Sequence, residues 1–206
     1  MIGTLTLATP SRPRWIALRR ALLLGLALSA AVAVRVALNG SSAPTAMTAG
    51  AVLGLALIGI ALRSGLSVRQ GDQPRQAVGA LGLGVVGGLV LVVLPGLLQP
   101  LSGAGLGLHP QPFAVWVLVT AIVAVGEESV LRGVLFDAVT EALGRPAAVL
   151  VTSVGFALIH VPLYGWHVVP LDLAVGFWLA GLRLVSGGIA APAVAHVLAD
   201  LATWWM

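Results

Sequence analysis

The sequence predicts an all-α protein, a polytopic transmembrane helical bundle of about seven spans. Hydrophobic residues form 59% of the 206-residue chain and charged residues only 9%, whereas a soluble domain carries about 25% charged residues. Long apolar stretches are separated by short breaks rich in glycine, proline and serine. All 11 residues counted as Lys or Arg are arginines, and most lie at the ends of these stretches, where they set membrane orientation.

The first expected span covers residues 20–38 and follows a basic leader. Its Ala- and Leu-rich sequence also fits a secretory signal, but we favour an uncleaved span because further spans follow and Arg35 can extend outward to the interface. Spans at 45–62 and 76–98 come next. The glycines of the latter are expected to pack closely against neighbouring helices; they are Gly79, Gly82, Gly84, Gly87 and Gly88.

The remaining expected spans are residues 113–143, 147–160, 171–184 and 189–205. The first of these is too long for a simple span, so a break is expected near Gly133. Val161-Pro162 is expected to close the helix at 147–160, and a loop through residue 170 then holds Tyr164, Trp166 and His167.

With this division, the arginines fall on one side of the membrane, which the positive-inside rule makes cytoplasmic together with the N-terminus. The chain is expected to form a single domain over 1–206 in the cell membrane, with its catalytic core at 113–206. Cysteine is absent, which excludes disulfides and a thiolate nucleophile. Nucleic acid is not an expected partner, because there is no basic stripe with interleaved aromatic residues.

Six ionisable residues lie in the apolar second half of the chain and form the candidate catalytic set: Glu127, Glu128, Arg132, His160, His196 and Asp200. A charged side chain at the bilayer centre costs roughly 2.5–3.5 kcal/mol on insertion scales, so such residues usually mark a functional site. A helix that carries two carboxylates and an arginine should hold its place only through partners on other helices. The sequence therefore predicts one shared polar pocket.

The spacing of these residues suggests separate roles. Arg132 follows Glu128 by four residues, so the two share a helix face and can pair, either as structural support or as part of the catalytic site. Glu127 points about 100° away from Glu128 and has no partner nearby in the sequence. This makes Glu127 the candidate general base. His196 and Asp200 share a face by the same four-residue spacing.

Two chemistries fit a carboxylate with two imidazoles, and both hydrolyse an amide. Glu127, His160 and His196 can hold Zn²⁺ and leave a fourth position for water. Alternatively, the carboxylate and one histidine activate water directly while other groups stabilise an oxyanion. The chain has no His-Glu-x-x-His sequence, and neither Ser129 nor Ser153 lies in a Gly-x-Ser-x-Gly setting.

Three motifs, in order, resemble the CPBP intramembrane proteases, which include CAAX prenyl proteases and bacteriocin-processing (Abi-like) proteins. They are Glu-Glu-x-x-x-Arg at 127–132, Phe-x-x-x-His at 156–160 and His-x-x-x-Asp at 196–200. The resemblance covers about 113–200, less than half of the chain. An Asn is common at position 200 in the prenyl-protease branch, and an ionised Asp cannot donate a hydrogen bond, which favours a metal or a protonated carboxyl there.

The resemblance implies an endopeptidase in which Glu127 activates water and His160 assists it or ligates a metal. His196 and Asp200 would then complete the site or stabilise the oxyanion, while Glu128 and Arg132 support it. Eukaryotic members remove the last three residues of prenylated CAAX proteins, and bacterial members are tied to bacteriocin processing or self-immunity. The expected partners are therefore the lipid bilayer and a peptide or protein substrate, lipidated or not.

Two other function classes stay open. A non-catalytic scaffold or self-immunity protein would keep the fold and bind a toxin or partner. A proton-coupled transporter would use Glu127 and His160 as a relay. The chain has no evident internal repeat, and its polar residues gather in a few helices, which argues against a transporter.

Overall fold

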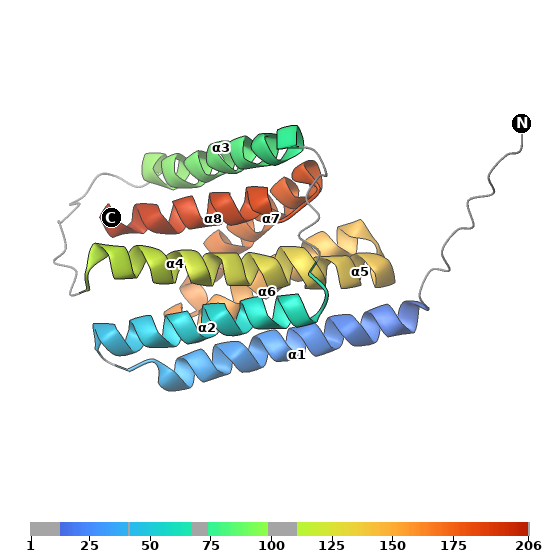
Figure 1. Ribbon diagram of the computed structural model, residues 1–206, viewed down its shortest axis with the longest axis horizontal. Helices are drawn as coiled ribbons and strands as arrows, with labels where there is room; N and C mark the ends of the chain where they lie inside the picture. The colour runs from blue at the N-terminus through green and yellow to red at the C-terminus, as the bar shows by residue number, and fades with distance from the viewer. Residues whose placement is uncertain (1–12, 41, 67–73, 99–110, 206) are drawn as a thin grey trace, which may run out of the picture.

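The computed structural model describes residues 13–40, 42–66, 74–98 and 111–205, and these ranges are almost entirely helical (Figure 1). The helices are α1 (Arg14–Leu38), α2 (Ala43–Arg63), α3 (Pro74–Leu98), α4 (Phe113–Glu128), α5 (Phe136–Leu143), α6 (Arg145–Tyr164), α7 (Val169–Ser186) and α8 (Ala190–Ala202). A π-helical segment, η1 (Ser129–Leu135), joins α4 to α5, and short 3-10 turns lie at η2 (Trp166–Val168) and η3 (Thr203–Trp205).

Within the described residues, six helical stretches are long and apolar enough to cross a membrane. They are α1, α2, residues 76–93 of α3, the continuous 113–143 unit, α6, and 166–186 around α7. The last helix, α8, has 13 residues and packs inside the bundle against α3, α4 and α7. The predicted all-α, polytopic fold class is confirmed.

The bundle has two layers. Figure 1 shows α1, α2, α4, α8 and α3 side by side in that order, with α6 and α7 behind them, and the contacts between neighbouring helices agree. The apolar core lies between the layers, where Leu57, Leu131 and Leu179 are fully buried. Helices α4, α6 and α8, which carry the three motifs, are therefore held around one interior region.

The predicted break in the long fourth span is confirmed. Gly133 has φ −91° and ψ −107°, which are not helical values, and the backbone from Ser129 to Leu135 follows a π-helix. Glycine tolerates this conformation because it lacks a side chain. π-Helical turns inside helices occur often at functional sites, and this one directly follows the two glutamates.

The predicted end of the fifth span is wrong. Helix α6 continues through Pro162 to Tyr164, so Tyr164 lies in the helix, and α7 begins at Val169 rather than at 171. Pro162 sits in the final turn, where its missing N–H removes a single backbone hydrogen bond. The helix ends instead at Gly165, whose φ of +89° suits glycine.

Glycines bring the helices of the site close together. A Cβ atom on Gly126 of α4 would lie 2.7 Å from the carbonyl oxygen of Gly54 on α2, so neither position has room for a side chain. On α3, Gly84 and Gly88 meet α8 in this way, and Gly87 meets the side chain of Leu182 on α7. The packing prediction is wrong for Gly79 and Gly82, because no atom of the part of the chain that the structure describes lies within 4 Å of such a Cβ.

Candidate active site

Glu127, His160 and His196 come together from three helices. The carboxylate oxygen Oε2 of Glu127 lies 3.8 Å from Nε2 of His160 and 4.0 Å from Nε2 of His196. Both Glu127 and His196 are buried, and the His160 side chain is 15% exposed. The predicted convergence of these three side chains from separate helices is confirmed. Both separations exceed hydrogen-bond length and lie within reach of one shared water molecule.

Glu128 faces the opposite side of the pocket and is fully buried with Arg132. Nη1 of Arg132 donates to Oε1 of Glu128 at 2.7 Å, and both side chains are 0% exposed. Nη2 of Arg132 donates to the carbonyl oxygen of Gly176 on α7 at 3.0 Å. The predicted i,i+4 pair is therefore confirmed, and it also ties α4 to α7. Removing one partner of such a buried pair costs roughly 3–5 kcal/mol.

His196 is held between two carboxylates. Its Nδ1 lies 3.1 Å from Oε1 of Glu128, and its Nε2 lies 3.5 Å from Oδ2 of Asp200. The predicted shared face of His196 and Asp200 is confirmed. Because Nδ1 is directed at a carboxylate, it carries a proton and donates. Nε2 is then the ring atom that faces Glu127 and the interior of the pocket.

His160 is oriented by two acceptors on its Nδ1 side. The carbonyl oxygen of Phe156 lies 3.0 Å from Nδ1, and Oδ2 of Asp172 on α7 lies 3.4 Å from the same atom. A proton on Nδ1 satisfies both acceptors and leaves Nε2 as the acceptor that faces Glu127. The sequence analysis missed Asp172. The sequence did contain a signal for it: Asp172 is an ionisable residue inside an apolar segment, the expected span 171–184.

Phe156 packs at the centre of the polar groups. Its ring makes edge contacts with the rings of His160 and His196, at centroid distances of 4.8 and 5.3 Å. The guanidinium of Arg132 lies over the same ring, 4.7 Å from its centroid. An aromatic face attracts a cation and fixes neighbouring rings without competing for their hydrogen bonds. The phenylalanine of the second motif therefore spaces the two imidazoles.

Arg35 does not extend outward as the sequence analysis expected. Its side chain is half-buried and lies close enough to Tyr164 on α6 and to Glu127 on α4 to interact with both electrostatically. Tyr164 in turn lies beside the His160 ring, with 5.9 Å between ring centroids. A cation near a helix end extends to the interface only if no polar partner lies nearer. The expectation failed because the polar groups near Arg35 lie on other helices, which the sequence alone does not place.

The expected zinc ligands do not fit a zinc ion as they stand. Zinc bonds of about 2.0–2.1 Å in tetrahedral geometry require neighbouring ligand atoms roughly 3.4 Å apart. The separations from Glu127 are 3.8 and 4.0 Å, and among the described residues no group of three or more His, Asp or Glu side chains has the arrangement of a metal site. A reaction at this site is therefore considered with protein groups alone.

Residues 109–202 match the family described as type II CAAX prenyl endopeptidase, Rce1-like. The match includes all six predicted site residues and confirms the resemblance to the CPBP/CAAX proteases. No curated protein and no solved structure matches the chain.

Proposed function

We propose that the protein is an intramembrane endopeptidase in which Glu127 activates a water molecule to hydrolyse a peptide bond. The observation that carries the proposal is the position of Oε2 of Glu127, 3.8 Å from His160 and 4.0 Å from His196. The match to a family of endopeptidases supports the same reaction. Apart from the end of α1 that carries Arg35, the helix ends that carry arginines lie at one end of the bundle (Figure 1), which supports a cell-membrane protein with a cytoplasmic N-terminus.

The water has two acceptors in this arrangement. It donates one hydrogen to the Glu127 carboxylate and the other to Nε2 of His160, and its oxygen attacks the carbonyl carbon of the substrate. Glu127 takes the proton of the attacking water and later transfers it to the departing amine. The amide bond breaks, and the two products carry a new carboxylate and a new amine.

His196 acts as a hydrogen-bond donor, whereas Glu127 and His160 act as acceptors. With Nδ1 directed at Glu128 and Nε2 near Asp200, the ring can bear protons on both nitrogens. Nε2 then donates to the oxygen that becomes negative when water adds to the carbonyl. Asp200 acts by holding this proton in place, so an aspartate at position 200 need not itself donate a hydrogen bond.

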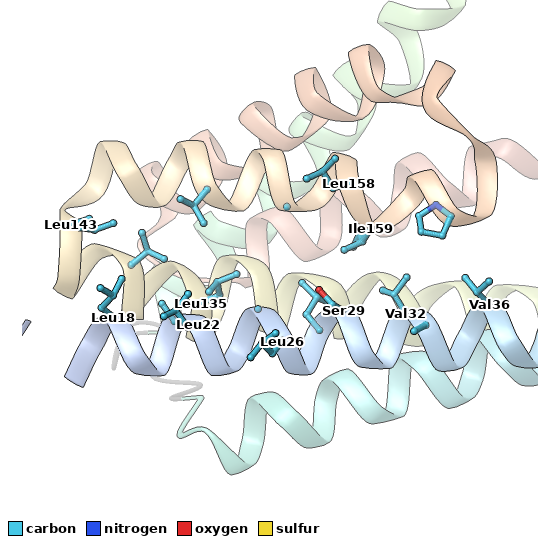
Figure 2. A pocket seen from close by; sticks show the side chains of 18 of the residues that line it. Leu18, Leu22, Leu26, Ser29, Val32, Val36, Leu135, Leu143, Leu158 and Ile159 are labelled. Atoms are coloured by element: carbon cyan, nitrogen blue, oxygen red, sulfur yellow. The ribbon is translucent and has the colours of Figure 1, made fainter. Parts of the chain in front are cut away.

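The substrate that we propose carries a lipid chain close to its cleaved bond. An apolar groove of about 840 Å³ runs between α1 and α6, with residues of η1 and α5 along its floor. Figure 2 shows Val32 and Val36 of α1 on one wall and Leu158 and Ile159 of α6 on the other. Ile159, which lines the groove, directly precedes His160, so α6 borders both the groove and the site. The family description, a prenyl endopeptidase, supports the same class of substrate.

Glu127→Gln tests the reaction. The probe is a peptide with an S-farnesylated cysteine four residues from its C-terminus, incubated with protein in lipid nanodiscs and followed by mass spectrometry. We expect kcat/KM to fall by at least about 100-fold, because general-base catalysis is worth roughly 10²–10⁴-fold. The matched control is Glu141→Gln, which changes an exposed glutamate of α5 and should leave cleavage within about twofold.

Equal cleavage by the wild type and Glu127→Gln would remove Glu127 from the mechanism. A cellular phenotype that survives Glu127→Gln would indicate the scaffold or immunity role instead. Metal analysis of the same preparation addresses zinc: we expect full activity with less than one equivalent of bound metal and no loss on chelation.

A further inference from the structure

The backbone hydrogen bonds change partners at the π-helical segment η1. In an α-helix, the N–H of Phe136 would donate to the carbonyl oxygen of Arg132, four residues earlier. It donates instead to the carbonyl oxygens of Gly133 and Leu131. Nε of Arg183, on α7, donates to the Arg132 carbonyl oxygen at 2.8 Å. A side chain from another helix therefore contacts the acceptor that regular α-helical winding would use.

Arg183 lies over the residues that follow the break at Gly133. Its guanidinium lies 5.5 Å from the ring centroid of Phe136, and its Nη2 donates to Oδ1 of Asp137 at 2.9 Å. The Arg183 side chain is 16% exposed, whereas that of Asp137 is 59% exposed. An exposed ion pair contributes little to stability, so the contact that can hold the backbone is the one to the Arg132 carbonyl oxygen.

Gly133 does not select the π-helical winding by itself. Glycine adopts many backbone conformations at similar cost, so neighbouring groups must decide which one is populated. A Cβ atom at Gly133 would lie 2.6 Å from Cδ1 of Leu66, just after α2, so Leu66 packs directly on the break. Arg183 adds a polar contact from α7.

The winding of η1 sets the direction of the two glutamates that precede it. Helix α5, which follows η1, packs against α1 and α6. Successive residues of an α-helix are turned by about 100°, so a change of one residue in the winding turns Glu127 by about that angle relative to α5. Oε2 of Glu127, which lies 3.8 Å from His160 and 4.0 Å from His196, would then no longer face both imidazoles.

We propose that Arg183 is a positioning residue, which holds the π-helical winding of η1 and so directs Glu127 toward His160 and His196. This inference rests on the proposed function, in which Glu127 activates the water. Arg183 acts through the backbone rather than on the reacting atoms, so its loss should lower kcat. KM should stay within about threefold, because most residues that line the groove lie on α1 and α6.

Arg183→Met tests the contact, because it removes every donor and keeps a long side chain. With the farnesylated peptide in nanodiscs, we expect kcat to fall at least about tenfold, the size of one charge-assisted hydrogen bond. Arg183→Lys keeps the charge and a donor, and should recover a large part of this loss. Asp137→Asn is the matched control: it removes only the exposed ion pair and should leave kcat within about twofold.

Hydrogen–deuterium exchange of residues 129–137, measured by mass spectrometry in the same nanodiscs, requires no turnover. Loss of the contact should make opening of η1 at least about tenfold more frequent, so this segment should exchange faster by that factor in Arg183→Met. Residues 76–93 of α3 are the internal reference and should exchange at the wild-type rate.

Unchanged exchange of residues 129–137 in Arg183→Met would overturn the inference, and so would faster exchange with an unaltered kcat. An equal loss of kcat in Asp137→Asn would assign the effect to the ion pair, and faster exchange that includes residues 76–93 would mean that Arg183 only stabilises the bundle. If the wild type cleaves no peptide, the proposed function fails, whereas faster exchange confined to residues 129–137 would still support the role of Arg183 in holding η1.

Discussion

At the scale of single residues, two adjacent glutamates have different surroundings and therefore different roles. Glu128 pairs with Arg132 at 2.7 Å and accepts from His196 at 3.1 Å, so its Oε1 is fully occupied. Among the described residues, Glu127 has no hydrogen-bond partner within ordinary length, and it faces two imidazoles. An ion pair fixes a geometry, whereas a buried carboxylate without a partner is available to take a proton.

Asp172 provides a test of how the imidazole is held. We expect Asp172→Asn to lower kcat by roughly tenfold with little change in KM, because one contact to Nδ1 of His160 is weakened while the contact from Phe156 stays. The measurement is a kcat and KM comparison over a range of pH. The pH profile of the variant should also shift, since the carboxylate that faces His160 has become neutral.

The matched control for this change is Asp137→Asn. Asp137 is a largely exposed carboxylate on α5 that pairs with Arg183 at 2.9 Å and does not touch an imidazole. The substitution Asp137→Asn should leave the pH profile unchanged. A loss of kcat in Asp172→Asn with an unaltered profile would assign Asp172 to packing instead of to the positioning of His160.

At the scale of elements, close backbone contacts set the position of the helices that carry the candidate site. Glu127 directly follows Gly126, which meets the backbone of Gly54 on α2. The π-helical segment after Glu128 is anchored by Arg183 of α7, whose Nε donates to the carbonyl oxygen of Arg132 at 2.8 Å. Small residues that let backbones approach, together with polar contacts between helices, are the usual means of association in lipid.

Gly126→Ala tests the close contact between α2 and α4. The added Cβ would lie 2.7 Å from the carbonyl oxygen of Gly54 and 3.1 Å from the Cβ of Leu57, so the helices must separate. We expect a loss of stability of about 1–3 kcal/mol, as for overpacking in other cores. Thermal unfolding in detergent, followed by circular dichroism, measures it, and cleavage should fall as Glu127 is displaced.

Gly59→Ala on α2 is the control for this prediction. A Cβ at Gly59 meets no atom within 4 Å, and alanine is the better helix former, so stability should be unchanged or slightly higher. Equal melting temperatures for Gly126→Ala and Gly59→Ala would mean that the α2–α4 contact can relax, and that it does not fix the position of Glu127.

At the scale of the whole molecule, the polar site and the apolar groove belong to different parts of the bundle. The polar groups project from α4, α6, α7 and α8, whereas the groove is lined by α1, η1, α5 and α6. Helix α6 is common to both and carries Ile159 into the groove and His160 into the site. This arrangement suits the proposed function, in which a lipidated peptide approaches from the bilayer and its peptide bond reaches the polar groups.

Filling the groove tests this arrangement. Gly25 lines the groove on α1, and a Cβ there meets no atom of the described residues within 4 Å, so Gly25→Phe should fit while occupying the space that we propose for the lipid. We expect cleavage of the farnesylated peptide to fall by roughly tenfold or more, whereas cleavage of the same peptide without the lipid should stay nearly constant. Competition between the two peptides in one reaction, quantified by mass spectrometry, measures the change.

Gly59→Phe serves as the matched control, because Gly59 has equally open surroundings and does not line the groove. It should leave the ratio between the two peptides at the wild-type value. An unchanged ratio in Gly25→Phe would place the lipid outside this groove.

The sequence by itself determined the membrane environment, the helices and most residues of the candidate site. Composition identifies a membrane bundle, and Gly133 marks the break in the long fourth span. Four-residue spacing pairs Glu128 with Arg132 and places His196 with Asp200, because residues on one helix face meet by local geometry alone. The cost of isolated charge in lipid then requires that the motif residues of separate helices meet.

Only the tertiary structure decided what surrounds each of these groups. Asp172 of α7 reaches His160 of α6, and Arg35 of α1 lies near Glu127 of α4, through the packing of helices that no spacing along the chain encodes. The end of α6 could not be placed from Pro162, because a proline stops a helix only where the following turn has no other support. Local spacing fixes which side chains share a helix face, but the packing of one helix on another fixes which faces meet.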